Sequence, residues 1–196
     1  MAKSGYHHGD LRATILAAAA DQIASDGVDA VSLRELARRA GVSHAAPAHH
    51  FGDRAGVLTA LAIEGFELLA AELTQAGPDF REVAVAYIRF AREHPGHFDV
   101  MFRHSLLRAD DARLAEARTK SAAALRSGVS ALNPGDVGQQ QATQLAAWSL
   151  VHGFAALWRE GALDNSSLAD EADPELLARR MLATVHFDRP ANSAVR

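Results

Sequence analysis

The stretch of the chain that decides the fold runs from residue 32 to residue 58 and reads SLRELARRAGVSHAAPAHHFGDRAGVL. Ser32 lies three residues before Glu35, which is the spacing of a capping box at the start of a helix. Apolar residues then recur at helical spacing with arginines between them, and Gly41 supplies a left-handed exit. These features predict a helix of about two turns.

A second short helix is predicted directly after the first. Ser43 is a suitable N-cap for a segment that runs through His49, and Pro47 falls in its first turn, where a missing N–H costs little. Two short helices joined by Gly-Val-Ser form the core of a helix-turn-helix, whose second helix enters the major groove of DNA. The outward side chains that fit phosphate or groove contact are Arg34, Arg38, Ser43, His44, Ala45 and His49.

The rest of the chain also has helical patterns and no alternating strand. Helices are predicted over 10–26, from Asp53 to the Gly77-Pro78 stop, over 80–93, after Pro95-Gly96, and over 110–132, 137–160 and 174–187. We therefore expect an all-α fold of about nine helices. A three-helix DNA-binding domain would occupy 1–58, a helical ligand-binding and dimerisation domain 59–190, and a disordered tail 191–196.

Composition excludes several classes of protein. The chain has 196 residues, is 48% hydrophobic and contains no Cys, which excludes disulfides, thiolate-rich zinc sites and cysteine nucleophiles. No apolar run approaches the roughly 18 residues of a membrane span, and the first residues, MAKSGYHHGDLR, lack the apolar core of a signal peptide. A cytoplasmic protein without a membrane partner is expected.

The net charge of −4 is low for a DNA-binding protein, because phosphate contacts supply most sequence-independent affinity. Residues 1–58 contain six Lys or Arg and six Asp or Glu, so all the excess negative charge lies C-terminal to them. Five of the ten histidines also lie in this stretch, where protonation beside phosphates can add positive charge.

Residues 9–58 resemble the DNA-binding domain of the TetR family, through the stretch quoted above and a preceding helix that ends in an Asp-Gly turn. The resemblance implies that the third helix reads the groove and that the fourth begins at the DNA backbone. Arg54 and the N–H groups near Asp53 would then be phosphate ligands. Phe51 is expected to hold the third helix on the first.

One position departs from the family pattern. Pro47-Ala48 replaces the usual Leu-Tyr, so the Tyr hydroxyl contact to phosphate is absent. We expect His49 and His50 to take over part of the backbone contact.

Residues 148–153, Trp-Ser-Leu-Val-His-Gly, resemble the signature of a TetR subgroup named for Trp-His-Gly. The family resemblance implies a homodimer in which helices 137–160 and 174–187 form a four-helix bundle with their symmetry mates. The operator would be a palindrome with half-sites about one DNA turn (~34–36 Å) apart or slightly more. Besides Trp148, the candidate interface residues are Leu150, Phe154, Leu157 and Met181.

Core-type side chains in the second part can also line an effector cavity. The candidates are Phe66, Leu69, Tyr87, Phe90, Phe98, Met101, Phe102, Leu125, Trp148 and His152, although His152 fits a hydrogen-bonded core or interface residue better than a ligand contact. The resulting hypothesis is a repressor that a small hydrophobic or aromatic effector releases from double-stranded DNA.

No enzyme, cofactor or metal is predicted. His94, His97, Asp99 and His104 lie close together in sequence but flank a Pro-Gly break that does not favour metal geometry. The chain has no nucleophile elbow, Walker loop, dinucleotide glycine pattern or zinc-protease helix. Two alternatives stay open: a regulator without an effector, and a helical small-molecule-binding protein whose DNA-binding head is degenerate, which Pro47-Ala48 would explain.

Overall fold

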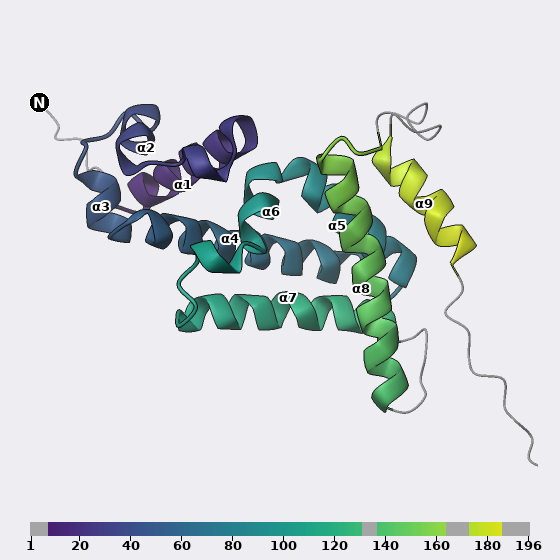
Figure 1. Cartoon of the computed structure of the whole chain (residues 1–196). Coiled ribbons are helices and arrows are strands. Elements are labelled where there is room, and N and C mark those ends of the chain that lie inside the picture. Colours follow the sequence, from purple (N-terminus) through teal and green to yellow (C-terminus); the bar gives the residue numbers. More distant parts are fainter. Residues whose placement is uncertain (1–7, 131–136, 164–172, 186–196) are drawn as a thin grey trace, which may run out of the picture. The chain divides into compact units, whose positions relative to one another are not determined.

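A computed structural model describes residues 8–130, 137–163 and 173–185 (Figure 1). Within these ranges the chain forms nine α-helices, two 3-10 turns and no strand, which confirms the all-α prediction. No helix within them is long and apolar enough to cross a membrane. The elements are α1 (His8–Asp26), η1 (Val28–Ala30), α2 (Leu33–Arg39), α3 (Ala46–Phe51), α4 (Arg54–Gln75), α5 (Phe80–Glu93), α6 (Pro95–Met101), η2 (His104–Leu106), α7 (Ala112–Ser130), α8 (Val137–Arg159) and α9 (Pro174–Thr184).

The helix boundaries follow local signals in the sequence. Gly77 has a φ of 80° and ends α4, and the Asp79 carboxylate accepts a hydrogen bond of 2.7 Å from the Arg81 N–H at the start of α5. The Asp173 carboxylate accepts one of 2.9 Å from the Glu175 N–H at the start of α9. The predicted helix ends at residues 132 and 187, the break at 133–135 and the tail at 191–196 lie outside the described residues.

The chain forms two compact units. The first unit comprises residues 8–69 and 93–120, and the second comprises the described parts of 70–92 and 121–185. The first unit thus contains α6 and parts of α4 and α7 in addition to the helix-turn-helix. The division of functions between 1–58 and 59–190 stays a prediction.

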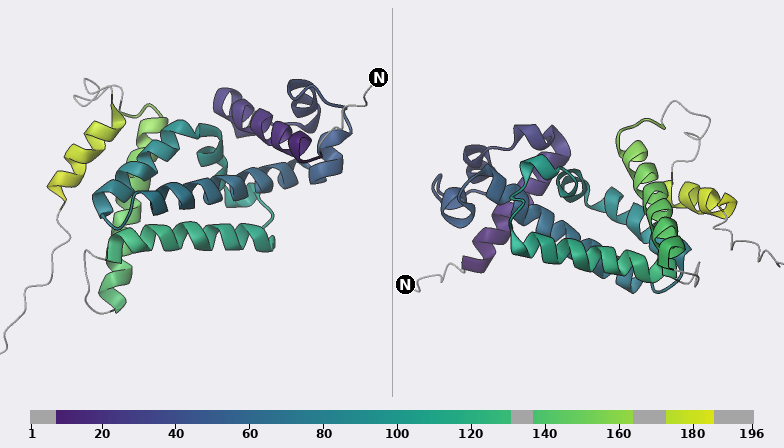
Figure 2. Two further views of the ribbon diagram at one scale, coloured as in Figure 1. Left: turned by 180° about the vertical axis from the view of Figure 1, so that it is seen from behind. Right: turned by 60° about the horizontal axis from the view of Figure 1, so that its bottom comes forward.

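In the first unit, α1 is the central helix and contacts α2, α3, α6 and η1 (Figures 1 and 2). Ile15, Ala19 and Ile23, which recur every four residues along this helix, are fully buried. Gly96 lies so close to α1 that a Cβ atom there would come within 2.1 Å of the Ala20 carbonyl oxygen. Helix α6 is therefore packed directly on the helix that supports the helix-turn-helix.

In the second unit, α5 supplies more buried side chains than any other helix, and Tyr87, Ile88 and Phe90 are among those that are fully buried. Gly128 of α7 leaves room for Val83, because an added Cβ would lie 2.7 Å from Val83 Cγ2. Three ion pairs among the described residues join α9 to α5. Arg179 donates to Glu82 at 2.6 Å, Arg89 donates to Glu175 at 2.7 Å, and Arg92 lies 2.9 Å from Glu175.

Candidate nucleic-acid interface

The first helix of the predicted helix-turn-helix is capped as expected. The Ser32 Oγ accepts a hydrogen bond of 3.3 Å from the Glu35 N–H, which confirms the Ser32 half of the capping box. Gly41, with a φ of 65°, ends α2, and the Val42 N–H donates to the Ala37 carbonyl at 3.0 Å. The turn between α2 and α3 is therefore closed by the backbone.

The predicted N-cap of the second helix was wrong. Helix α3 begins at Ala46, and its N-cap is Ala45, which makes no side-chain cap bond. The Ala46 N–H donates instead to the Ser43 carbonyl at 3.0 Å, so a backbone turn does what the Ser43 hydroxyl was expected to do. The Ser43 residue stays exposed. Pro47 lies in the first turn as predicted.

The structure separates the predicted DNA-contact residues from the core of the helix-turn-helix. The exposed ones are Arg34, Arg38, Ser43, His44, Ala45 and His49, whereas His50 is half-buried. The residues between them, Leu36, Ala37, Ala46 and Phe51, are buried. Phe51 also lies against α1, with the Arg12 guanidinium 5.1 Å from its ring centre. The polar residues that would meet DNA are thus exposed on α2, the turn and α3, while the apolar residues of these elements are buried.

The arginines of this face differ in how far their charge is neutralised. Arg38 Nε donates to Glu35 Oε2 at 2.8 Å and Arg39 Nε to Glu35 Oε1 at 2.9 Å. The hydrogen bond from Arg38, and then that from Arg39, lowers the pKa of Glu35 to about 2. Arg34 is exposed and forms no hydrogen bond or ion pair with the described residues, so its charge is the most available for a phosphate.

Arg54 is placed differently from the expectation. Its Nη2 donates to the Val28 carbonyl at 2.7 Å and its Nε donates to the Val31 carbonyl at 3.0 Å, while Asp29 lies 3.8 Å away. The guanidinium therefore holds the η1 turn to the start of α4. A phosphate contact by Arg54 stays a prediction, and the side chain has a structural partner in this conformation.

Arg108 was not among the predicted site residues, although it lies at the corner between α3 and α4. Its Nη2 donates to Asp53 Oδ1 at 3.0 Å and to the Phe51 carbonyl at 3.3 Å. Its backbone N–H donates to the Thr59 hydroxyl at 2.9 Å. No motif could have indicated this residue, because it lies far along the chain from the helix-turn-helix and no pattern surrounds it.

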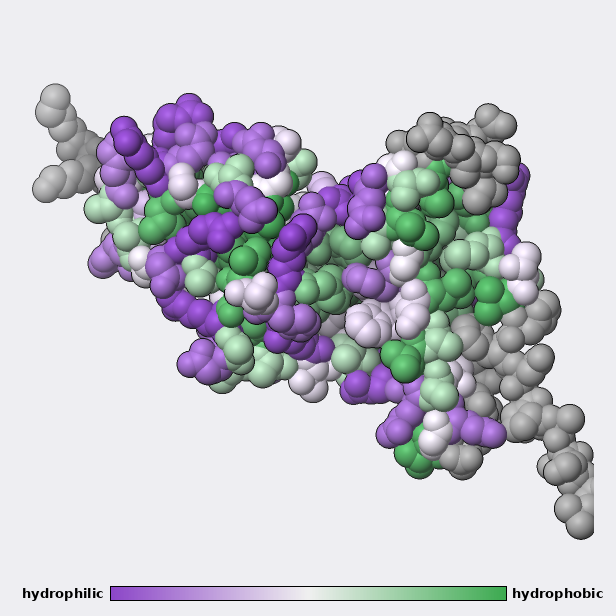
Figure 3. Space-filling view, viewed as in Figure 1, coloured by the Kyte–Doolittle hydropathy of each residue, from purple (hydrophilic) through white to green (hydrophobic). Residues whose placement is uncertain are grey.

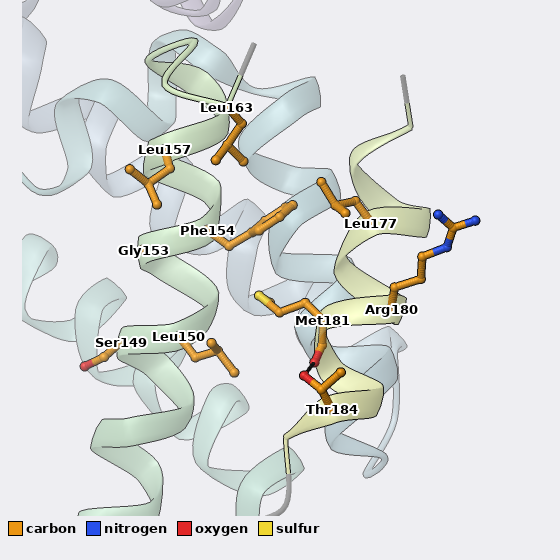
Figure 4. A pocket seen from close by; sticks show the side chains of 10 residues that line it. All are labelled: Ser149, Leu150, Gly153, Phe154, Leu157, Leu163, Leu177, Arg180, Met181 and Thr184. Atoms are coloured by element: carbon orange, nitrogen blue, oxygen red, sulfur yellow. Dashed lines mark hydrogen bonds between the residues drawn. The ribbon is translucent and has the colours of Figure 1, made fainter. Parts of the chain in front are cut away.

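A groove of about 620 Å³ separates α8 from α9 in the second unit (Figure 4). Phe154 and Leu150 point from α8 toward α9, and Met181 points back from α9. The predicted interface residues that line the groove are Leu150, Phe154, Leu157 and Met181. The structure therefore brings these four together, and their role in dimerisation stays a prediction.

Large apolar side chains stay exposed along α8 and α9. Leu157 is 46% exposed, Leu176 41% and Trp148 38%. In the view of Figure 3, hydrophobic residues gather over these two helices. Apolar residues scattered singly on a surface need no explanation, but a contiguous apolar face is typical of an interface.

The ten predicted pocket residues fall into two groups, one in each unit. In the first unit, Phe102 lies edge-on to Phe66 and Phe98 at ring distances of 5.7 and 5.5 Å, and the Arg118 guanidinium lies over Phe66. Leu69 and Met101 belong to this unit, and the second unit contains Tyr87, Phe90, Leu125, Trp148 and His152. Their role as the lining of an effector cavity stays a prediction.

A polar pair lies within the second group. The Tyr87 hydroxyl and His152 Nδ1 are 2.9 Å apart, and the Trp148 ring lies beside His152 at 5.6 Å. Burial raises the pKa of Tyr87 and lowers that of His152, so the neutral forms are favoured and the hydroxyl can donate to the imidazole. His152 is thus half-buried and hydrogen-bonded, and the choice between a structural role and a ligand contact stays a prediction.

Of the three histidines considered as metal ligands, two have polar partners of their own, and the third, His94, lies beside His97 at a ring distance of 5.7 Å. His97 Nε2 lies 3.1 Å from Glu64 Oε1, and His104 Nδ1 lies 3.0 Å from Arg118 Nη2. Within the described residues, no group of three or more acidic or histidine side chains is placed to hold a metal ion.

Comparison with known proteins gives two family matches. Residues 15–61 match the bacterial regulatory proteins of the tetR family, and residues 80–185 match a tetracyclin repressor-like C-terminal domain. Neither description refers to the Trp-His-Gly subgroup, which stays a prediction. No curated protein matches the chain.

Several solved structures share the fold. A Rhodococcus sp. RHA1 protein of unknown function is 34% identical, with a TM-score of 0.71 over 91% of this chain and 96% of that one. A tetR-family regulatory protein from Rhodococcus RHA1 is 22% identical, with a TM-score of 0.67 over 88% and 93%. The TetR family regulator PfmR from Thermus thermophilus is 22% identical, with a TM-score of 0.58 over 85% and 90%. Because the C-terminal family match alone spans more than half of the chain, and the N-terminal match covers the helix-turn-helix, the chain belongs to the TetR family of DNA-binding transcription regulators.

Proposed function

We propose that the protein is a homodimeric repressor that binds a palindromic operator and is released from it by a small hydrophobic or aromatic effector. The observation that carries the DNA-binding part is the polar face of the helix-turn-helix. Arg34, Ser43, His44 and His49 are exposed on it together, while the apolar residues between them are buried.

This face suits base reading more than strong non-specific attraction. Hydroxyl and imidazole groups can bond to base edges, and the small Ala45 side chain lets the backbone approach the groove. Arg38 and Arg39 already share the Glu35 carboxylate, so few cations are available to phosphates. We therefore expect specific binding with a shallow salt dependence, because the slope follows the number of phosphates neutralised.

The occupant proposed for the groove between α8 and α9 is a second copy of this chain. Six of the ten residues that line the groove have apolar side chains, and one of these, Leu157, is exposed. A two-fold axis would place the same groove of each copy against its partner and bury both. The two heads would then meet successive major grooves about one DNA turn (~34–36 Å) apart.

Release by an effector would act through α4. This helix contributes residues to both compact units, so a ligand that shifts it can change the head's fit to DNA. A coupling of about 1–3 kcal/mol, which changes affinity about 5- to 150-fold, is enough. Aromatic and aliphatic side chains predominate among the predicted pocket residues, which supports an apolar or aromatic ligand.

The test is selection of duplexes from a random DNA pool by the wild type and by an Arg34→Ala/His44→Ala variant at one salt concentration. Arg54 is left unchanged because its guanidinium supports the η1 turn. Arg126→Ala is the matched control, since it removes one exposed charge outside the helix-turn-helix.

Each outcome has a defined meaning. A palindrome that is enriched by the wild type and the control but lost in the double variant supports the proposal. Enrichment by none of the three favours a small-molecule-binding protein with a degenerate head. Enrichment together with a compound screen that never shifts the melting temperature favours a regulator without an effector.

A further inference from the structure

We propose that Arg108 is a positioning residue for DNA recognition, which fixes the corner between the recognition helix α3 and helix α4. This role rests on the DNA binding proposed above. The residue lies outside the helix-turn-helix in sequence, between η2 and α7, and reaches back to the corner within the first unit.

The segment that carries Arg108 is anchored before its side chain reaches the corner. The Arg108 N–H donates to the Thr59 hydroxyl at 2.9 Å, and Thr59 is only 2% exposed. The side chain then extends toward the start of α4 and donates to the carbonyl of Phe51, the last residue of α3. Carbonyl groups at the C-terminus of a helix lack intrahelical partners, and a cation is favourable there.

The corner between α3 and α4 is tightly packed, so the contact between Arg108 and the Phe51 carbonyl constrains the geometry of the corner. Gly52 has a φ of 81°, and a Cβ atom there would lie 3.2 Å from Arg108 Nη2. A Cβ atom on Gly56 would lie 1.9 Å from the Phe51 carbonyl oxygen and 2.9 Å from Arg108 Nη2. The guanidinium thus packs on two glycines and on the end of the recognition helix at once. The orientation of α3 relative to α4 therefore depends on the Arg108 guanidinium.

Arg108 also neutralises a charge at the corner. Asp53 caps α4 by accepting from the Gly56 N–H at 2.8 Å, and its side chain is 65% exposed. The hydrogen bond from the Gly56 N–H, and next that from Arg108, lowers the pKa of Asp53, so the carboxylate is ionised at neutral pH. An unpaired carboxylate there would repel DNA phosphates. Arg54, the cation assigned to this place by the family pattern, is turned toward η1.

A positioning role differs measurably from two other roles. If Arg108 orients α3, its loss weakens binding to the operator while binding to unrelated DNA, which depends on charge alone, is preserved. If Arg108 contacted a phosphate, both affinities would fall and the salt slope would decrease by about 0.9. If it only stabilised the fold, the melting temperature would fall and neither affinity would change for the folded protein.

The experiment measures Arg108→Gln and wild type, both full-length, on the duplex enriched by the wild type and on a scrambled duplex of equal length. We expect at least roughly a tenfold loss of operator affinity, the effect of one misread base pair, with unchanged scrambled-DNA affinity and salt slope. Equal losses on both duplexes, or no loss on the operator, would overturn the proposal. Arg113→Gln, which removes an exposed charge at the start of α7, is the control.

A second variant keeps the test decisive if Arg108→Gln does not fold. Arg108→Lys keeps the charge, but its side chain ends one bond short of Nη2, the atom that donates to both the Phe51 carbonyl and Asp53. It should show the same selective loss on the operator, and full operator affinity in this variant would contradict the positioning role. A wild type that does not discriminate between the two duplexes would instead contradict the proposed function itself.

Discussion

The corner between α3 and α4 and the groove between α8 and α9 are both built around a glycine, but only the corner is complete within one chain. A Cβ atom on Gly56 would lie 1.9 Å from the Phe51 carbonyl oxygen, whereas one on Gly153 would meet nothing within 4 Å. At the corner, Arg108 satisfies both the carbonyl and the carboxylate. In the groove, Leu157 stays 46% exposed.

The difference indicates where each region obtains its stability. In a region that its own chain packs completely and whose polar groups are all hydrogen-bonded, a substitution changes the free energy of unfolding. In a region that leaves apolar side chains in water, a substitution changes the free energy of association, because these side chains are buried only against a partner. The following substitutions test this distinction.

The largest effect is expected from Leu157→Asp in the groove. Burying an unpaired carboxylate at each of two symmetric positions should weaken the dimer by at least about 3 kcal/mol, or more than roughly 100-fold. The monomer should keep its stability, because Leu157 is half-exposed there. Sedimentation equilibrium over a range of protein concentrations measures the change.

Ala115→Asp provides the control, since it adds the same charge at an exposed position of α7. The control should associate like the wild type. If Leu157→Asp also stays dimeric, then the groove between α8 and α9 is not the interface.

At the corner, Gly56→Ala should lower the free energy of unfolding by about 2–3 kcal/mol, the upper part of the range for a side chain forced into packed space. The new methyl group would overlap the backbone carbonyl of Phe51, which cannot move without shifting α3. Urea unfolding followed by circular dichroism gives the value. A variant as stable as the wild type would show that the corner yields easily and does not constrain the recognition helix.

Local patterns in the sequence predicted the helices but not the contacts of their long side chains. The Ser32 cap, the stop at Gly77 and the buried stripe of α1 depend on near neighbours, so spacing alone reveals them. Ser43 was assigned wrongly because a backbone turn and a side-chain cap satisfy the same N–H groups. The position of Arg108 depends on the tertiary fold, which no spacing in the motif encodes.

Arg54 also shows that local patterns do not predict the contacts of long side chains. Its position in the motif indicates a contact with DNA, whereas its hydrogen bonds indicate a structural role. Arg54→Met should lower the free energy of unfolding by about 1.5–3 kcal/mol, since two part-buried carbonyls lose a charged donor. Arg34→Met, at an exposed position, should leave stability within about 0.5 kcal/mol. Unchanged stability in Arg54→Met together with weaker DNA binding would restore the phosphate contact implied by the family pattern.

Gly153→Ala in α8 is expected to have the smallest effect. It should stabilise the isolated chain but weaken the dimer. In the isolated chain the methyl group meets open space and improves helix propensity, so stability should rise by about 0.5–1 kcal/mol. In the dimer the same methyl group would enter the groove where the partner's helices are proposed to pack. Measured in the monomeric Leu157→Asp background, Gly153→Ala should therefore stabilise the protein, whereas in the wild-type background it should weaken association. Stabilisation in both backgrounds, with unchanged association, would show that no helix approaches Gly153 closely, and would place the dimer contact elsewhere on α8 and α9.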